Sequence, residues 1–177
     1  MHILLTILLI IGSLIALFLL IAFFTKRECR VEKTITINKP KQEVFDYIKL
    51  LKNQEYYSVW VMKDPRIKLV YTGVDGTVGA TSSWTSDNKN VGAGAQEIKE
   101  LAEGEHLNVE IRFEKPFKAT NYATTTVTAI GPSQTRVSNL FYGTSKFPVN
   151  FMNLFMDKMI GKDMLQNLEN MKKNLEQ

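Results

Sequence analysis

The stretch GVDGTVGATSSW, residues 73–84, decides the fold class, because it places three glycines within seven residues and then runs into a tryptophan. Glycine at this density is typical either of a loop that binds phosphate or of a tight turn between strands. A phosphate loop continues into a helix whose N-terminus faces the anion. Here the following residues are rich in Thr, Ser and Trp without helical periodicity. The stretch therefore predicts a hairpin with Asp75-Gly76 at its turn, and a nucleotide-binding loop is excluded.

Strand patterns continue on both sides of this hairpin. Apolar and polar residues alternate at 30–38 and again at 107–114, as in half-buried strands. A proline-led helix at 39–51 follows the first strand, and 148–175 has a long helical apolar pattern. The remaining strands are expected at 67–73, 79–86, 91–102, 119–130 and 135–145. This order predicts an α+β domain with about seven antiparallel strands and a long C-terminal helix.

The N-terminal region has a different character, because residues 3–24 are apolar apart from Thr6, Gly12 and Ser13. A helix of that length rises about 33 Å and would cross a hydrocarbon layer of about 30 Å. We therefore expect one transmembrane helix over 1–25, a basic flank over 26–30 and a folded domain over 31–177. A cleaved signal peptide is the main alternative, although a basic n-region and a small-x-small cleavage site are lacking. A hydrophobic hairpin or an oligomerisation helix would also fit the composition.

The charge pattern bears on orientation and partners. Lys26, Arg27 and Arg30 directly follow the apolar run, so the positive-inside rule places the domain in the cytoplasm. The single cysteine, Cys29, cannot form an intramolecular disulfide and fits a reducing compartment. The net charge is only +4, and basic residues are interspersed with acidic ones along the domain. The composition therefore predicts membrane association and no nucleic-acid binding.

The inventory of reactive side chains is poor. The two histidines are His2, at the membrane end, and His106, in the polar turn EGEH. No cluster of His, Cys and carboxylate residues has the spacing of a metal site, and no serine lies in a recognisable nucleophile motif. We expect no metal and no cofactor. A defined catalytic activity is also not expected, since only unpaired carboxylates and tyrosines could act as acid or base.

Several segments in order resemble the START-like, or SRPBCC, superfamily, in particular the polyketide cyclase/dehydrase-type proteins. The resemblance covers about 31–176 and rests on INKPKQEVFDYI (37–48), Trp60 with KDP (63–65), the glycine hairpin, VGAGAQEI (91–98) and IGKDMLQNLENMKKNLE (160–176). It implies a helix-grip fold, in which a curved antiparallel sheet wraps around the C-terminal helix and leaves a cavity between them.

The candidate ligand-binding residues are the apolar and aromatic positions expected to line this cavity, together with a few polar ones that could orient a ligand. Asn121 is a further polar position inside an apolar strand context. Gly161 lies in the middle of the last helix, where it permits a bend, leaves room for a ligand or is a neutral substitution without a role. The last helix is also rich in methionine, which suits either core filling or a soft pocket wall. The candidates are Trp60, Trp84, Gln96, Ile98, Val109, Ile111, Tyr142, Phe155 and Met159.

Three functional hypotheses follow. The first is a membrane-anchored protein that binds a hydrophobic small molecule or lipid between the sheet and the last helix. The second is a polyketide cyclase/dehydratase-like enzyme acting on a hydrophobic substrate, with a titratable group of perturbed pKa inside the cavity. The third is a protein-interaction or stress-related module, which would have a filled cavity and an exposed apolar patch.

Overall fold

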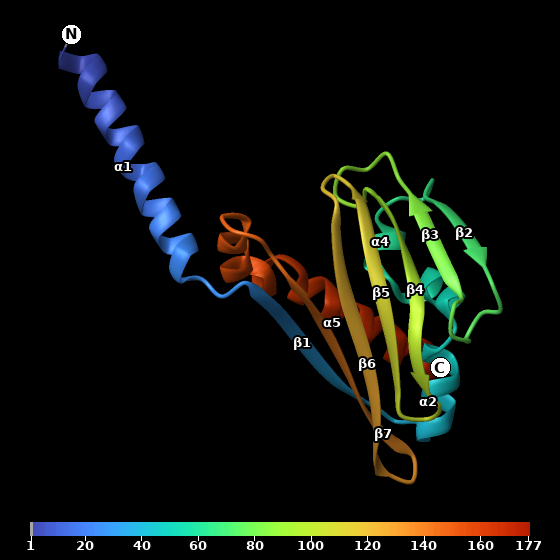
Figure 1. Ribbon diagram of the computed structural model, residues 1–177. Coiled ribbons are helices and arrows are strands. Elements are labelled where there is room, and N and C mark those ends of the chain that lie inside the picture. The colour runs from blue at the N-terminus through green and yellow to red at the C-terminus, as the bar shows by residue number, and fades with distance from the viewer. Residues whose placement is uncertain (1) are drawn as a thin grey trace.

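The computed structural model describes residues 2–177, most of which form a domain built on a seven-stranded antiparallel sheet (Figure 1). The strand order is β1-β7-β6-β5-β4-β3-β2, so every strand pairs with its neighbour in sequence except β1, which pairs with β7. The strands are β1 (Glu28–Ile37), β2 (Lys68–Thr72), β3 (Thr81–Thr85), β4 (Ala93–Ala102), β5 (His106–Lys115), β6 (Ala119–Gly131) and β7 (Gln134–Thr144).

Helices cover one face of this curved sheet, and α5 runs along it (Figure 1). The helix α1 extends away from the domain. The helical elements are α1 (His2–Phe24), α2 (Lys41–Ile48), η1 (Leu51–Asn53), α3 (Gln54–Tyr57), α4 (Val59–Met62), η2 (Val149–Phe155) and α5 (Met156–Leu175), where η marks a 3-10 helix. The predicted α+β helix-grip architecture, with a curved antiparallel sheet around a long C-terminal helix and an N-terminal apolar helix before it, is confirmed.

The glycine stretch forms the β2–β3 hairpin, as predicted. Its three glycines have φ values of 80°, 80° and 88°, a region that residues with a Cβ rarely enter. Asp75 has an additional role, because its carboxylate accepts hydrogen bonds from the backbone N–H groups of Leu51 (2.7 Å) and Lys52 (3.1 Å). The turn therefore satisfies donors at the start of η1 and fixes the hairpin to the helical layer.

The inner face of the sheet, which packs against the helices, carries two separate groups of buried side chains. The larger group, here called the main core, includes Phe45 of α2, Ile98 of β4, Val137 of β7 and Leu168 of α5. A smaller group, here called the α1-end cluster, has Cys29, Val31 and Met164 buried at its centre. Around this centre lie side chains that are only half-buried, namely Trp60, Phe141, Met156 and Ile160. The two groups divide the inner face into a closed part and a more accessible part.

The C-terminal helical region differs from the sequence prediction of one helix over 148–175. It consists of the 3-10 helix η2 followed by the α-helix α5. A 3-10 helix has about 3.0 residues per turn instead of 3.6, so the apolar phase changes where one element passes into the other. The stripe that faces the sheet consists of Met156, Ile160, Met164, Leu168, Met171 and Leu175.

Candidate binding site

Pairing across the strands shows which candidates share the inner face. Ile98 lies opposite Val109, which lies opposite Ala123, and all three are on the inner face. The next inner row towards α1 contains Gln96, Ile111 and Asn121. Ile98 and Val109 are buried in the main core, whereas the side chains of the second row are only half-buried. A ligand approaching from the α1 end would therefore meet Gln96, Ile111 and Asn121 before the main core.

The two tryptophans lie on different sides of this region. Trp60, on α4, packs against the α1-end cluster and is half-buried. Trp84, on β3, has its ring over Gly94 and makes an edge contact with Phe113, with ring centroids 5.9 Å apart. Its Nε1 donates a hydrogen bond to the carbonyl of Val91 (3.3 Å). Both indoles are thus fixed by packing while part of each surface stays accessible.

Gln96 belongs to a polar group under α3. Its Nε2 donates to Oε1 of Gln54 (2.6 Å), and Nε2 of Gln54 donates back to Oε1 of Gln96 (3.3 Å). Ser82 is directly opposite Gln96 on β3, and Tyr71 is opposite Ser82 on β2. The hydroxyl of Tyr71 donates to Oε1 of Glu55 (2.8 Å). These residues bring hydrogen-bonding capacity to the inner face beside the half-buried apolar side chains.

The electrostatics of this group favour neutral tyrosines. Burial, together with the hydrogen bond to Glu55, raises the pKa of Tyr71. Burial also raises the pKa of Tyr57, which lies in the main core. Both hydroxyls therefore keep their protons near neutral pH and can act as hydrogen-bond donors, but not as bases.

Three of the predicted candidates lie away from the inner face. Tyr142 stacks on Tyr122 on the opposite face of the sheet, with centroids 5.5 Å apart, and its hydroxyl accepts a hydrogen bond from Nδ2 of Asn108 (2.9 Å). The expectation that Tyr142 points inwards is therefore wrong. Residues 140–142, Leu-Phe-Tyr, do not alternate between apolar and polar, so the sequence does not show which of them faces inwards. In the sheet, Phe141 lies opposite the inward-facing Val31 of β1, so Phe141 faces inwards and Tyr142 faces outwards.

Phe155 and Met159 are the other two corrections. Their side chains are 45% and 53% exposed, so neither faces the sheet. Met159 lies within α5, where 3.6 residues per turn put it outside the stripe that begins with Met156 and Ile160, and Phe155 is the last residue of η2, before α5 begins. Met156 and Ile160 take the inward positions that the sequence pattern assigned to them.

A polar row inside the domain was missed from the sequence. Lys33 of β1 lies opposite Asn139, which lies opposite Thr125, and Nδ2 of Asn139 donates to Oγ1 of Thr125 (2.7 Å). Lys33 also forms an ion pair with Asp157 of α5, with Nζ 2.7 Å from Oδ1. In the alternating pattern of residues 30–38, Lys33 is in phase with Val31 and Ile35. This phase already indicates that the side chain of Lys33 faces the interior.

Gly161 explains how Lys33 is accommodated. A Cβ at this position would lie 2.7 Å from Cε of Lys33 and 2.8 Å from Oδ1 of Asp157. The glycine in the middle of α5 therefore leaves room for a side chain of the protein itself, the half-buried Lys33, where a bend or a ligand had been considered.

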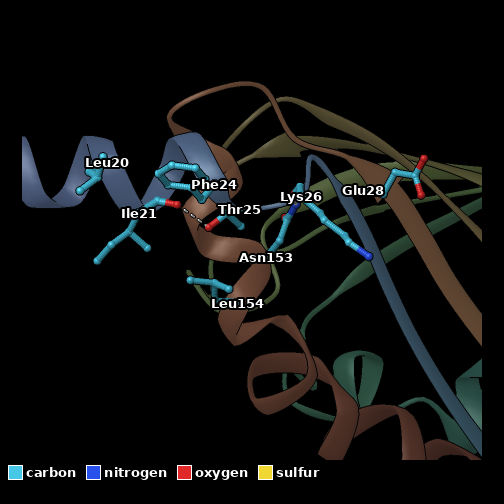
Figure 2. Close-up of a pocket in the computed structure, with 8 residues that line it drawn as sticks. All are labelled: Leu20, Ile21, Phe24, Thr25, Lys26, Glu28, Asn153 and Leu154. Carbon is cyan, nitrogen blue, oxygen red and sulfur yellow. Dashed lines mark hydrogen bonds between the residues drawn. The ribbon is translucent and has the colours of Figure 1, made fainter.

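Two open pockets, of about 600 and 550 Å³, lie where α1 meets the domain. Figure 2 shows the larger one, between the last turns of α1 and η2, with Leu20, Phe24 and Leu154 on its walls and Lys26 and Glu28 beside them. The smaller one is lined by Arg27, Lys146 and Phe147 among others. Neither pocket lies between the sheet and α5, where the sequence predicts the binding cavity.

The junction itself is hydrogen-bonded. Nδ2 of Asn150 donates to the carbonyls of Ala22 (2.6 Å) and Thr25 (2.8 Å) at the end of α1. Nδ2 of Asn153 donates to the carbonyls of Lys26 (3.1 Å) and Arg27 (3.0 Å). Two side chains of η2 thus donate hydrogen bonds to four backbone carbonyls in the last turn of α1 and in the residues that follow it. Over residues 2–177, no group of three or more His, Cys, Asp or Glu residues is placed to hold a metal ion.

The fold and this half-open inner face define the chain as a member of the START-like, or SRPBCC, superfamily. Residues 28–176 match the family described as polyketide cyclase / dehydrase and lipid transport, and the chain belongs to that family. No curated protein matches the sequence.

Solved structures share the fold at low sequence identity. Norcoclaurine synthase from Thalictrum flavum, in complex with dopamine and hydroxybenzaldehyde, is 10% identical, with 88% of this chain and 90% of that chain covered and a TM-score of 0.65. A protein from Mesorhizobium loti is 16% identical, with 83% and 96% covered and a TM-score of 0.58. The structure of Ara h 8.0201 is 13% identical, with 81% and 97% covered and a TM-score of 0.52.

Proposed function

We propose that the protein is a membrane-anchored binding protein that holds a hydrophobic small molecule or lipid against the inner face of its sheet. The observation that carries the proposal is the α1-end cluster, where the half-buried side chains, among them Trp60, Phe141 and Ile160, outnumber the fully buried ones, whereas most side chains of the main core are fully buried. Apolar surface with a few convergent polar groups, here Gln96 and Asn121, is typical of ligand sites. The lipid transport in the family description supports a ligand of this class.

The proposed anchor is α1. It is long and apolar enough to cross a membrane, and nearly all its side chains are exposed, unlike those of a core helix in a soluble protein. With Lys26, Arg27 and Arg30 after it, the domain would lie in the cytoplasm as a single-pass protein. A site tethered beside the bilayer meets membrane-dissolved ligands at high effective concentration. Resistance to alkaline carbonate extraction, and protection of the domain from protease added to intact cells, test this part.

Native mass spectrometry of the full chain, purified from host membranes in detergent, tests the binding site. Three chains are compared: the unchanged protein, Ile111→Trp, which fills the half-open row, and Ile130→Trp, which adds the same bulk at an exposed position near the end of β6. We expect a retained mass of lipid size in the unchanged protein and Ile130→Trp, and its loss in Ile111→Trp. Asn121→Leu, which keeps the number and branching of the side-chain atoms but removes the amide, repeats the test if Ile111→Trp fails to fold. Equal retention in all chains would place the ligand elsewhere.

A cyclase/dehydratase-like enzyme is the second candidate, favoured by the Tyr71–Glu55 hydrogen bond beside Gln96. In that case Tyr71, which keeps its proton, would donate a hydrogen bond to a substrate carbonyl oxygen. Tyr71→Phe separates the two functions, because a pure binding protein would retain its ligand and an enzyme would lose turnover with binding intact.

A further inference from the structure

We propose that η2 is a membrane-docking element that inserts its apolar side chains into the interface of the same bilayer that α1 crosses. This inference rests on the proposed function, since it requires α1 to span a membrane. It adds a second contact with the bilayer and thereby fixes the height and tilt of the domain. The partner is a lipid surface, and the argument comes from depth, exposure, charge and the rigid junction.

The depth of η2 in the bilayer follows from one aromatic contact with α1. The ring of Phe151 packs edge-on against the ring of Phe18, with centroids 5.0 Å apart. Phe18 precedes the end of α1 at Phe24 by six residues, which corresponds to about 9 Å along a helix. The apolar run of α1 exceeds the hydrocarbon layer by only about 3 Å, so Phe18 must lie below the layer's edge. Phe151 is therefore held at the depth at which interfacial helices lie, about 5–10 Å.

The exposure of the apolar side chains of η2 agrees with that depth. Along η2, the side chains of Val149 and Leu154 are 61% and 56% exposed, and Met152 is also exposed. Phe147, just before η2, and Phe155, at its end, continue this apolar surface. Such a concentration of exposed apolar side chains marks an interaction surface. Its continuity with α1, through Phe151 and the walls of the larger pocket, identifies lipid as the occupant (Figure 2).

Charge at the rim completes the pattern. Lys26, Arg27 and Lys146 are exposed at the junction, and the last two line the smaller pocket together with Phe147. Basic side chains beside a buried apolar segment interact with anionic head groups and place the segment at the head-group boundary. Hydrogen bonds from the side-chain amides of Asn150 and Asn153 to backbone carbonyls at and just after the end of α1 hold η2 in this position.

Depth-dependent quenching of the full chain in vesicles tests the inference. Leu154→Cys is labelled with the fluorophore NBD and reconstituted into phosphatidylcholine and phosphatidylglycerol brominated near the head-group end of the chains. Ile130→Cys is the matched control, because Ile130 is also exposed but lies at the end of β6 next to the β6–β7 turn, far from the end of β1 that adjoins α1. Native Cys29 is buried and its pKa is raised by that burial, so it reacts little with the label.

We expect about threefold stronger quenching at position 154 than at position 130, as for a probe about 5–10 Å inside the interface. A label at Val149→Cys repeats the measurement from another turn of η2 and covers the case in which Leu154→Cys fails to fold. Equal quenching at 154 and 130, in a chain that floats with the vesicles and resists carbonate, overturns the docking of η2 and leaves the anchor intact. A chain that does not float overturns both proposals.

Discussion

The two parts of the inner face of the sheet are made from the same kinds of residues but differ in closure. In the main core, Phe45 is fully buried, and the helices α2 and α5 cover the strands. In the α1-end cluster, Phe141 on β7 remains half-buried, although it also packs beneath α5. The difference teaches that one continuous sheet–helix interface can provide stability at one end and leave accessible apolar surface at the other. Substitutions matched between the two ends test this division.

The largest expected effect comes from truncating the two phenylalanines. Phe45→Ala should lower the free energy of unfolding by about 3–5 kcal/mol, because it leaves a cavity in a closed core. Phe141→Ala should cost only about 1–2 kcal/mol, since part of its surface is already in water. Urea denaturation of the full chain in detergent, followed by circular dichroism, measures both. Equal losses would mean that the α1-end cluster is as closed as the main core.

A pair of glycines gives the next contrast. A Cβ at Gly94 would lie 2.5 Å from the carbonyl oxygen of Arg112 and 2.6 Å from the ring of Trp84. Because the backbone cannot yield, Gly94→Ala should destabilise the domain by about 1–3 kcal/mol and alter the Trp84 fluorescence. Gly161→Ala meets only the flexible ends of Lys33 and Asp157, and alanine favours a helix by about 1 kcal/mol.

The net effect of Gly161→Ala should therefore be close to zero in the same denaturation experiment. A large loss there would show that the Lys33–Asp157 pair cannot move, and that the polar row is part of a rigid core. An unchanged stability for Gly94→Ala would show instead that the sheet is looser beneath Trp84 than its geometry indicates.

The smallest expected effect is a pH dependence at Asp64, which connects the end of α4 to the β3–β4 loop. The hydroxyl of Ser86 donates to Oδ2 (2.6 Å) and the N–H of Arg66 donates to Oδ1 (2.9 Å), and these bonds lower the pKa of Asp64 below its ordinary value. A lowered folded-state pKa contributes stability above the unfolded-state pKa, and this is lost as the pH falls through the folded-state value.

The melting temperature of the full chain should accordingly fall as the pH drops from about 4 towards 2, and the fall should be smaller in Asp64→Asn. Melting curves at pH 6 and pH 3 for both chains measure this difference. If the variant loses as much as the unchanged protein, other carboxylates carry the acid sensitivity and Asp64 has no special part in holding α4.

Much of the fold could be predicted from the sequence, because strand alternation and turn glycines are local signals. The hairpin at 73–80 and the inward phase of Ile98 and Val109 were predicted in this way, although both residues were expected to line a cavity and are instead buried in the main core. The site was less accessible to such reasoning. The prediction for Tyr142 was wrong because a run of apolar residues does not show which side chains face inwards until the paired strand is known. The strand that pairs with β7 is β1, which comes from the other end of the sequence.

The C-terminal region shows a second limit of prediction from the sequence. A helical stripe over 148–175 looks continuous in sequence, but η2 is held in a 3-10 form while it contacts α1 through Phe151 and Asn150. The change from a 3-10 helix to an α-helix is not visible in the local pattern, and the apolar positions over 148–175 are too many for one stripe, so Phe155 and Met159 lie outside it. Lys33 shows the opposite case, since its inward phase was visible but its charge suggested the surface.

The hydrogen-bonded junction between α1 and η2 also limits how far the domain can move relative to α1. A flexible tether lets a domain roam over a distance that grows with the square root of its length. Here only residues 25–27 separate α1 from β1, and their carbonyls are bonded to Asn150 and Asn153. The domain therefore cannot range over such a distance about α1. With α1 as the proposed membrane anchor, every copy would present the same face to the bilayer, and a ligand dissolved in the bilayer would reach it by lateral diffusion, as in a two-dimensional search.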